Sequence, residues 1–446
     1  MADLRSKLEA LAQSAGVSVG VDWKQRIATM ETKRAEGAFE VEKVVPGEVW
    51  HPPGEAEADD PLGFYLVREE WPLDAAHGNL FFGDLMAVDG ASIAFSAKDE
   101  ELISFNPETT FFVDTETTGL MGGTGTMVFL MGIAYIREGK LRLDQCFLRD
   151  FDDEEPMLHY LRELFRGCET VVSYNGKSFD LPLLRTRFIQ NRIPFPLDSV
   201  AHYDLLHAAR RFWKRRLQDC SLTNIERNIL GVERHGDVPS ALIPQLWLDY
   251  LRKRDARPLE PVFYHHKTDI LSLVTLTAWV ARCLATPNGG GFEHAEDRLS
   301  LARLHFQQRQ WEETVAQTRL LLATEQPPAL RHETLTLQAN ALKKLQRWPE
   351  MGEAWALLHH EFPRDRGAAL ELAKFHEHRA RDLGAAANVC SDVIEFIETR
   401  EALGRADAMA LADLAAFKLR LARIQGKLHR SLGNDTSTDL DWREET

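Results

Sequence analysis

The sequence predicts an α/β domain, in which helices flank a mixed β-sheet, followed by an all-α region of helical repeats. Three observations support this fold class. Closely spaced apolar segments around residues 109–148 are typical of antiparallel neighbouring strands. Strand-like and helix-like segments then alternate, which favours parallel additions to the same sheet. After residue 293 the pattern is helical and repeats weakly.

The composition limits the partners of the chain. With 446 residues and 44% hydrophobic content, the chain is long enough for two or three domains. A net charge of −15 argues against a broad basic surface, so we expect any contact with nucleic acid to be local or bridged by metal. Five scattered cysteines without a C-x-x-C favour a reducing cytosol. Apolar segments fall short of the roughly 20 residues of a membrane span, so we expect a cytoplasmic protein without a membrane partner.

Residues 1–104 are expected to form an N-terminal α/β extension. The segment 1–16 alternates charged residues with Leu and Ala like an amphipathic helix, and the Pro/Gly-rich acidic segment "VPGEVWHPPGEAEADDPLG" indicates a loop. Strands are expected in "FYLVREEWPL", residues 64–73, and in "NLFFGDLMAV", residues 79–88, with a turn at His77 and Gly78 between them.

Residues 105–286 are expected to form one sheet domain. The segment "REGK" is typical of a tight hairpin turn between two of its strands. The expected strands are 109–113, 126–136, 141–148, 170–175 and 199–204, with helices at 156–166 and 181–191 and a run of helices to about 285.

The C-terminal part is predicted to form helical repeats, which follow a linker, "ATPNGGGFE", at residues 285–293. Three similar segments start at Leu301, Leu337 and Leu372, a period close to the 34 residues of tetratricopeptide repeats. In these segments Trp311, Trp348 and Leu383 occupy matching places. We expect tetratricopeptide-like repeats over 293–430 that hold a protein partner, with generic helical hairpins as the alternative, and a disordered acidic tail over 431–446.

The segment "FFVDTETTGL", residues 111–120, carries the first chemical signal. An apolar strand runs directly into Asp114 and Glu116, which lie two residues apart and therefore on one face of a strand. Two carboxylates held together cost free energy unless a cation lies beside them. The segment therefore predicts a cation site.

Two later segments carry further carboxylates. In "SYNGKSFDLPLL", residues 173–184, Asp180 opens a helix beyond a strand end, where an N-cap role is the alternative. In "FYHHKTDILSLVTLTAWVA", residues 263–281, Asp269 stands at the polar start of an apolar helix, and His265 lies one turn earlier on the same face. Helix-start electrostatics is the alternative there.

Together these segments resemble the DEDD exonucleases of the ribonuclease H-like superfamily. The motif "DTETTG" and the later pattern N-x-x-x-F-D carry the resemblance, and "DLLHAARRFWKRRLQDCSLTNIERNILGVER" is similar to the YprB-type branch. The resemblance covers about residues 105–285. It implies a five-stranded mixed sheet and two divalent ions, Mg²⁺ or Mn²⁺, with Asp114, Glu116, Asp180 and Asp269 as metal ligands. Two such ions need several carboxylate oxygens to offset their charge.

The resemblance also implies a function, a 3′→5′ exonuclease acting on single-stranded DNA or RNA. An endonuclease on the same fold is one alternative, and a helical-repeat adaptor with a weak nuclease domain is another.

Three neighbouring residues are candidates for the general base. Members of the family carry either His five residues before the last Asp or Tyr four residues before it, whereas this sequence has Tyr264 at five and His265 at four. An imidazole with a pKa of about 6.5 suits proton transfer better than a phenol. We therefore expect His265 to be catalytic beside the four carboxylates. Tyr264 is the first alternative, and His266, which should point further away from the carboxylates, is the second.

Candidate substrate contacts lie in three places. The helical segment "RRFWKRR", residues 210–216, offers Arg211, Lys214, Arg215 and Arg216 to phosphates and its two aromatic residues to bases; a solvated helix face with core aromatics is the alternative. Thr117 and Thr118, before the Gly-rich hairpin loop "GLMGGTGT", and Asn175 are further candidates. We expect Asp204 to be a helix N-cap rather than another ligand.

Overall fold

The computed structural model describes residues 63–119, 125–286 and 290–435. The helix expected at 1–16, part of the Gly-rich loop, part of the linker and the end of the tail lie outside the described residues. The strands are β1 (Tyr65–Pro72), β2 (Ala76–His77), β3 (Leu80–Phe81), β4 (Thr110–Thr117), β5 (Val128–Arg137), β6 (Lys140–Phe147), β7 (Thr170–Ser173) and β8 (Ala201–Asp204). The helices of the sheet domain are α3 (Gly90–Ala97), α4 (Glu154–Leu164), α5 (Asp180–Gln190), α6 (Leu205–Leu217), α7 (Leu222–Ile225), α8 (Ile243–Lys253) and α9 (Glu260–Ala285). The later helices are α10 (Ala295–Gln307), α11 (Trp311–Leu322), α12 (Pro328–Lys344), α13 (Trp348–Glu361), α14 (Arg366–Phe375), α15 (Leu383–Ala402) and α16 (Ala408–Asp435).

The main sheet is mixed, as the sequence predicts, and has six strands in the order β1-β6-β5-β4-β7-β8. The pairs β1–β6, β6–β5 and β5–β4 are antiparallel, whereas β4–β7 and β7–β8 are parallel. The expectation of five strands is wrong because β1, from the N-terminal extension, pairs along β6 from Tyr65 opposite Phe147. The boundary expected at residue 105 therefore cuts through one sheet.

A second correction concerns the strand expected at residues 79–88. Only Leu80 and Phe81 are extended, and a 3-10 helix follows over Phe82–Ala87. The backbone N–H of Gly83 donates to the carbonyl of Leu73 at 2.6 Å, and the carboxylate of Asp84 accepts from the N–H of Phe81. These local bonds turn the chain where a strand would continue.

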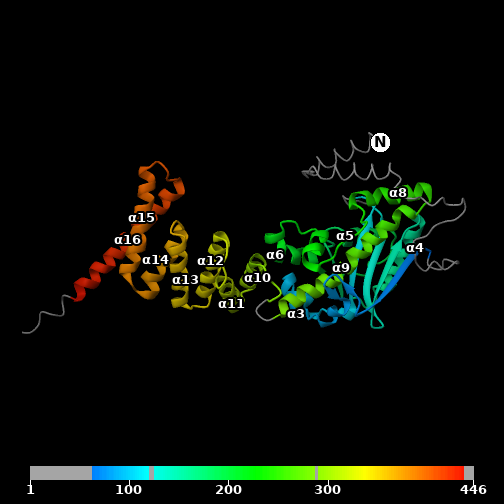
Figure 1. Ribbon diagram of the computed structural model, residues 1–446, viewed down its shortest axis with the longest axis horizontal. Helices are drawn as coiled ribbons and strands as arrows, with labels where there is room; N and C mark the ends of the chain where they lie inside the picture. The colour runs from blue at the N-terminus through cyan, green and yellow to red at the C-terminus, as the bar shows by residue number, and fades with distance from the viewer. Residues whose placement is uncertain (1–62, 120–124, 287–289, 436–446) are drawn as a thin grey trace, which may run out of the picture. The chain divides into compact units, whose positions relative to one another are not determined.

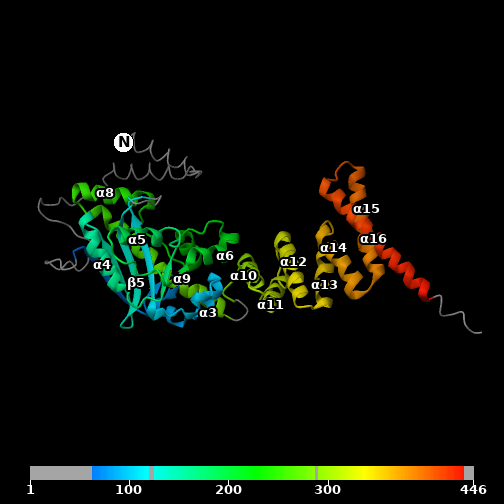
Figure 2. The same cartoon turned by 180° about the vertical axis from the view of Figure 1, so that it is seen from behind.

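Successive side chains of β4 face two different layers. Phe112 belongs to the core that β4 shares with α9, α6 and α3, whereas Phe111 packs edge-on against Phe165 at the end of α4. Figures 1 and 2 show the sheet from its two sides, with α9 in the layer seen in Figure 1 and α4 and α5 in the layer seen in Figure 2. Asp114 and Glu116 have the parity of Phe112, so they face α9.

The sequence predicts that helix α9 begins near Asp269, but the helix begins at Glu260. Pro261 lies in the first turn, where its missing N–H costs nothing. His265 and Asp269 are therefore inside the helix. By length and composition the segment Arg257–Ala285 could cross a membrane, but 72% of its apolar window is buried inside the protein, as in a core helix.

Gly132 on β5 allows α9 to approach the sheet closely. A Cβ at this position would lie 2.0 Å from Cδ1 of Ile270 and 2.5 Å from Cε1 of His266. Gly132 also stands opposite Asp114 in the β4–β5 ladder. The closest approach of helix to sheet thus coincides with the strand position that carries the first carboxylate.

Helices α10 to α16 form the all-α region that the sequence predicts. Trp311, Trp348 and Leu383 are the first residues of α11, α13 and α15, so the matching positions of the three repeats are equivalent in the structure. Helix α16 runs to Asp435, so the first residues of the expected tail are helical.

The expected linker does not separate two cores. Phe292, near its end, and Leu301 and Leu304 of α10 belong to the same buried cluster as Phe212 and Trp213 of α6. Helix α10 is therefore packed against the sheet domain, and a second core, around Trp355 and Leu372, begins further along the helices.

Candidate metal and catalytic site

Strand β4 delivers Asp114 and Glu116 to one end of the sheet. The ladder with β5 keeps its register as far as Glu116 and shifts between Glu116 and Thr117, where the strand ends. Both side chains are mostly buried, with 18% and 14% of their surface exposed. The D-x-E spacing thus places two carboxylates side by side under α9.

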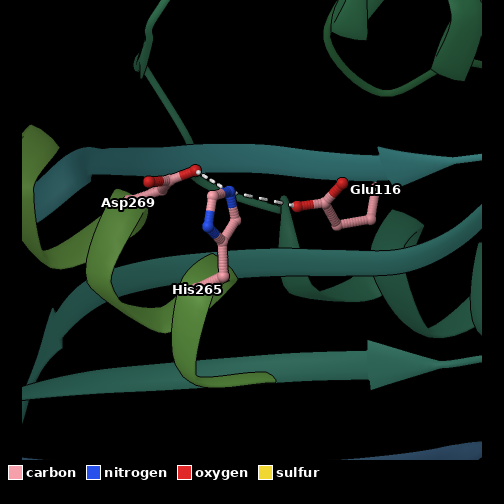
Figure 3. Close-up of side chains that lie close together, drawn as sticks. All are labelled: Glu116, His265 and Asp269. Carbon is pink, nitrogen blue, oxygen red and sulfur yellow. Dashed lines mark ion pairs between the residues drawn. The ribbon is translucent and has the colours of Figure 1, made fainter. Parts of the chain in front are cut away.

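Helix α9 brings His265 and Asp269 to the same point. Nε2 of His265 lies 3.4 Å from Oδ2 of Asp269 and 3.9 Å from Oε1 of Glu116. One ligand atom from each of the three residues lies within 4.8 Å of the others, and Figure 3 shows the imidazole between the two carboxylates. One strand and one helix, far apart in sequence, therefore form a compact O/N donor set.

Asp180 reaches the site from the other layer of the sheet. It is the first residue of α5, and its carboxylate accepts a hydrogen bond from the hydroxyl of Thr115, which lies between Asp114 and Glu116 on β4. Asp180 is outside the three-residue cluster, yet its charge contributes to raising the pKa of both Asp114 and Glu116.

The carboxylates are held where negative charge is unfavourable. Burial, and then the charges of Asp269, Asp180 and Glu116, raise the pKa of Asp114 well above its usual range. Burial raises the pKa of Glu116 to about 8, although the charge of His265 opposes this shift. Burial also raises the pKa of Asp180 to about 6, against the hydrogen bond from Thr115. A bound divalent cation would remove this penalty, and a set rich in carboxylate oxygens fits Mg²⁺ or Mn²⁺.

Arg234 is a site residue that the sequence reasoning missed. It lies in the loop before α8, and only 5% of its side chain is exposed. Its guanidinium donates to both oxygens of Glu226 at 2.6 Å and also donates to Asp269. A buried cation therefore holds one of the predicted metal ligands in place. The sequence signal was weak, because one Arg in a polar loop has no periodicity to reveal it.

The Glu226 carboxylate links this cation to the interior. Ser272 of α9 donates to Glu226 at 2.6 Å, and Nε2 of His77 lies 2.8 Å from the same hydroxyl. Burial, and then the charge of Arg234, lower the pKa of His77 to about 4. His77 is the last residue of β2 and pairs with Leu80 of β3, so the expected turn includes Gly78 but not His77, whose side chain belongs to this buried network.

The three candidate bases occupy different environments. His265 is buried, and its Nδ1 lies 2.7 Å from Oδ1 of Asp237, another residue not anticipated from the sequence. Burial lowers the pKa of His265, but the hydrogen bond to Asp237 and the nearby carboxylates outweigh this effect and raise it. Tyr264 points elsewhere, with its hydroxyl 3.4 Å from the backbone N of His235.

The sequence predicts that His266 points away from the site, but the structure places its ring beneath the site. Its ring is fully buried, with Nε2 3.1 Å from the carbonyl of Asp114 and Nδ1 3.0 Å from the amide of Gln145. Burial lowers the pKa of His266 to about 3, so the ring is neutral. His266 therefore supports the backbone of β4.

The polar residues around the strand ends mainly shape their own loops. Thr117 donates to the carbonyl of Gly119 at 2.9 Å, and the hydroxyl of Thr118 accepts from the N–H of Met127. Asp204 caps α6, as expected, by accepting from the N–H of Leu206. The same carboxylate accepts from the N–H of Asn175 at 2.8 Å, which fixes the loop before Asp180.

The aromatic residues of "RRFWKRR" do not form a stacking platform. Phe212 and Trp213 are buried in the core, as the alternative interpretation held. Two of the basic residues contact the helical region instead of forming a free solvated face: Arg215 pairs with Glu333 at 2.7 Å and Arg216 with Asp297 at 2.8 Å.

The remaining two basic candidates differ in their partners. Arg211 donates to the carbonyl of Ser96 at 2.6 Å. Lys214 is exposed on α6, and its ammonium makes no hydrogen bond or ion pair with any residue in the described ranges.

The fold and site define a domain of the RNase_H superfamily, whose family model matches residues 111–281. Members of this superfamily are typically metal-dependent nucleases, and membership supports a nucleic-acid-cleaving function. A curated relative, the uncharacterized protein YprB of Bacillus subtilis (strain 168), is 30% identical over 380 residues, which cover 82% of this chain and 86% of YprB. The chain belongs to the YprB family. The family B DNA polymerase of the hyperthermophilic archaeon Pyrobaculum calidifontis aligns with 13% identity and a TM-score of 0.31, over 45% of this chain and 29% of that chain.

Proposed function

We propose that this protein is a two-metal-ion nuclease that removes nucleotides from the 3′ end of single-stranded DNA or RNA. The observation that carries the proposal is the meeting of Glu116, His265 and Asp269 within 4.8 Å, beside the buried carboxylate of Asp114. The 3′→5′ polarity and the preference for single strands rest on the resemblance to DEDD exonucleases.

Asp114, Glu116, Asp180 and Asp269 would hold the ions, Mg²⁺ or Mn²⁺. When bound, such ions polarise the phosphodiester and offset the charge that develops at the leaving oxygen. Without a cation the buried carboxylates repel one another, as the raised pKa of Asp114 indicates. The donor set is thus suited to an ion-loaded state.

His265 is proposed to orient the attacking water and accept its proton. If Nδ1 donates its hydrogen to Asp237, at 2.7 Å, the lone pair of Nε2 lies on the side of Glu116 and Asp269. The hydroxyl of Ser240 is 3.4 Å from the same Nε2 atom. Tyr264 has no such position, because its hydroxyl lies against the backbone of His235. The His265–Asp237 contact therefore favours His265 over Tyr264 as base.

Arg234 is proposed as a positioning residue rather than a catalytic one. Its bidentate pair with Glu226 fixes the guanidinium, which in turn bonds Asp269. The carboxylate of Asp269 is thereby aimed toward His265 and Glu116. Such support of a ligand by a neighbouring side chain commonly determines metal affinity.

End-labelled substrates test the proposal. Single-stranded DNA, single-stranded RNA and duplexes, labelled at either end, are incubated with Mg²⁺, Mn²⁺ or EDTA. A 3′→5′ exonuclease releases a 3′ label at once as a mononucleotide and shortens 5′-labelled strands stepwise. Asp114→Asn should abolish hydrolysis, and Asp392→Asn, at an exposed position on α15, is the matched control. Turnover in EDTA or in Asp114→Asn would exclude the two-metal assignment, and cutting of a circular strand would make the enzyme an endonuclease.

A further inference from the structure

A basic groove lies on the surface between α6 of the sheet domain and α10 of the helical region. It has a volume of about 420 Å³, and five cationic side chains line it: Arg210, Arg211, Lys214 and Arg215 from α6 and Arg303 from α10. The chain as a whole carries a net charge of −15, so a groove lined by five cationic side chains differs from the average charge of the protein.

The positive charge of the groove is only partly compensated. Glu333 is shared between Arg215 and Arg303. Arg210 and Lys214 are exposed, lie one turn apart on α6, and have no hydrogen bond or ion pair from their side chains among the described residues. Like charges one helical turn apart repel each other. A polyanion lying along α6 would offset this repulsion.

The groove continues toward the proposed catalytic site. A second hollow, of about 480 Å³, shares Arg210 and Lys214 with the first and reaches Tyr174 and Asn175. Asn175 lies in the loop that leads to Asp180, and Asp219 adds one carboxylate to this second hollow. Helix α6 is about 20 Å long, so the two hollows together offer a path of that order from Asn175 to α10.

We propose that this groove binds the phosphate backbone of the single-stranded substrate, with α10 of the helical region as one of its walls. The inference rests on the proposed nuclease function and adds a role in substrate binding for the helical region. Phe212 and Trp213 are buried, so α6 presents charges rather than ring faces to the strand. Recognition here is therefore of phosphates, without dependence on base sequence.

Binding measurements test the inference on the full chain. The inactive Asp114→Asn protein is titrated into a fluorescent single-stranded 20-mer, DNA or RNA, and anisotropy is followed between 50 and 300 mM salt. Each lost phosphate contact lowers the salt slope by about 0.7 and, at 0.1 M salt, weakens Kd by roughly 5-fold. Arg210→Ala with Lys214→Ala should lower the slope by about 1.4 and weaken Kd by roughly 25-fold. Arg303→Ala should lower the slope by about 0.7.

The matched control is Arg137→Ala with Lys344→Ala, which removes the same charges. Both residues are exposed, Arg137 at the far end of β5 from Asp114 and Lys344 at the end of α12. A groove variant that binds like this control would overturn the inference, and so would a parent protein that does not bind single strands. A loss with Arg210→Ala and Lys214→Ala but none with Arg303→Ala would overturn the role of α10.

Cleavage by the active protein is measured separately. Groove-dependent binding without hydrolysis would refute the proposed nuclease function while leaving the groove as a binding site. Hydrolysis by the active enzyme, with Kd and salt slope unchanged in the groove variants, would refute the groove alone.

Discussion

Neutralising Glu116 should stabilise the metal-free protein in a strongly pH-dependent way. Burial raises the pKa of this carboxyl from its usual 4.5 to about 8. A carboxyl whose pKa is higher in the folded than in the unfolded protein takes up a proton on folding. The free energy of unfolding therefore falls as the pH rises from about 4.5 to about 8.

The size of the effect follows from that interval. Each unit of pKa difference corresponds to about 1.4 kcal/mol, so Glu116 costs the metal-free fold roughly 4 kcal/mol at pH 8 and less than about 1 kcal/mol at pH 5. Glu116→Gln removes this cost because an amide does not ionise. For a domain of this size, about 1 kcal/mol shifts Tm by roughly 2–4 °C, so the variant should melt roughly 8–16 °C higher than the wild type at pH 8 in EDTA.

Metal should narrow the difference in stability between Glu116→Gln and the wild type. Divalent ions stabilise the wild type in proportion to the logarithm of their concentration over Kd, about 2.7 kcal/mol at 100 times Kd. Glu116→Gln has lost a ligand and should gain less. The assay is thermal unfolding at pH 5 and pH 8, with EDTA or with Mg²⁺ or Mn²⁺, and with Glu353→Gln on α13, an exposed position, as the matched control. The reasoning would be refuted if the difference in Tm between Glu116→Gln and the wild type were the same at both pH values. It would also be refuted if metal left that difference unchanged.

Three further predictions concern single side chains. His265→Ala should lower the rate of hydrolysis by roughly 10²–10⁴-fold while Tyr264→Phe costs little, since a positioned general base contributes about that factor; the reverse order in single-turnover rates would assign the base to Tyr264. Glu226→Gln should lower the free energy of unfolding by about 3 kcal/mol, because it breaks a buried ion pair with Arg234; an unchanged urea midpoint would contradict this. Gly132→Ala should cost roughly 1–3 kcal/mol by overpacking against α9, and a thermal unfolding curve like that of the wild type would contradict the close approach.

Two controls sharpen these measurements. Gly426→Ala, in α16 with open space around the glycine, should stabilise the protein by roughly 0.5–1 kcal/mol, the opposite sign to Gly132→Ala. Glu353→Gln again serves as the comparison for Glu226→Gln.

The sequence alone determined the parts of this protein that depend on neighbouring residues. The apolar strand before Asp114 and Glu116, the helix that begins at Asp180 and the mixed sheet all follow from periodicity and from residues a few positions apart. The equivalence of Trp311 and Trp348, at the start of α11 and α13, follows from an internal repeat.

Tertiary structure decided the features that depend on which elements meet. The sixth strand exists because residues 65–72 pair with residues 140–147, and no local pattern encodes that partner. The same holds for Phe212 and Trp213, which share the core with Phe292 from the expected linker.

The site itself shows the same division. The types of its carboxylates could be read from short motifs, but the side chain that holds Asp269 in place is Arg234, which is 35 positions away in the sequence. His266 was placed incorrectly because α9 begins earlier than its apolar pattern indicates and Gly132 lets the helix approach β5. Ionic and packing contacts act through space, so sequence separation carries little information about them, whereas strand and helix periods are fixed by the backbone and are visible in the sequence.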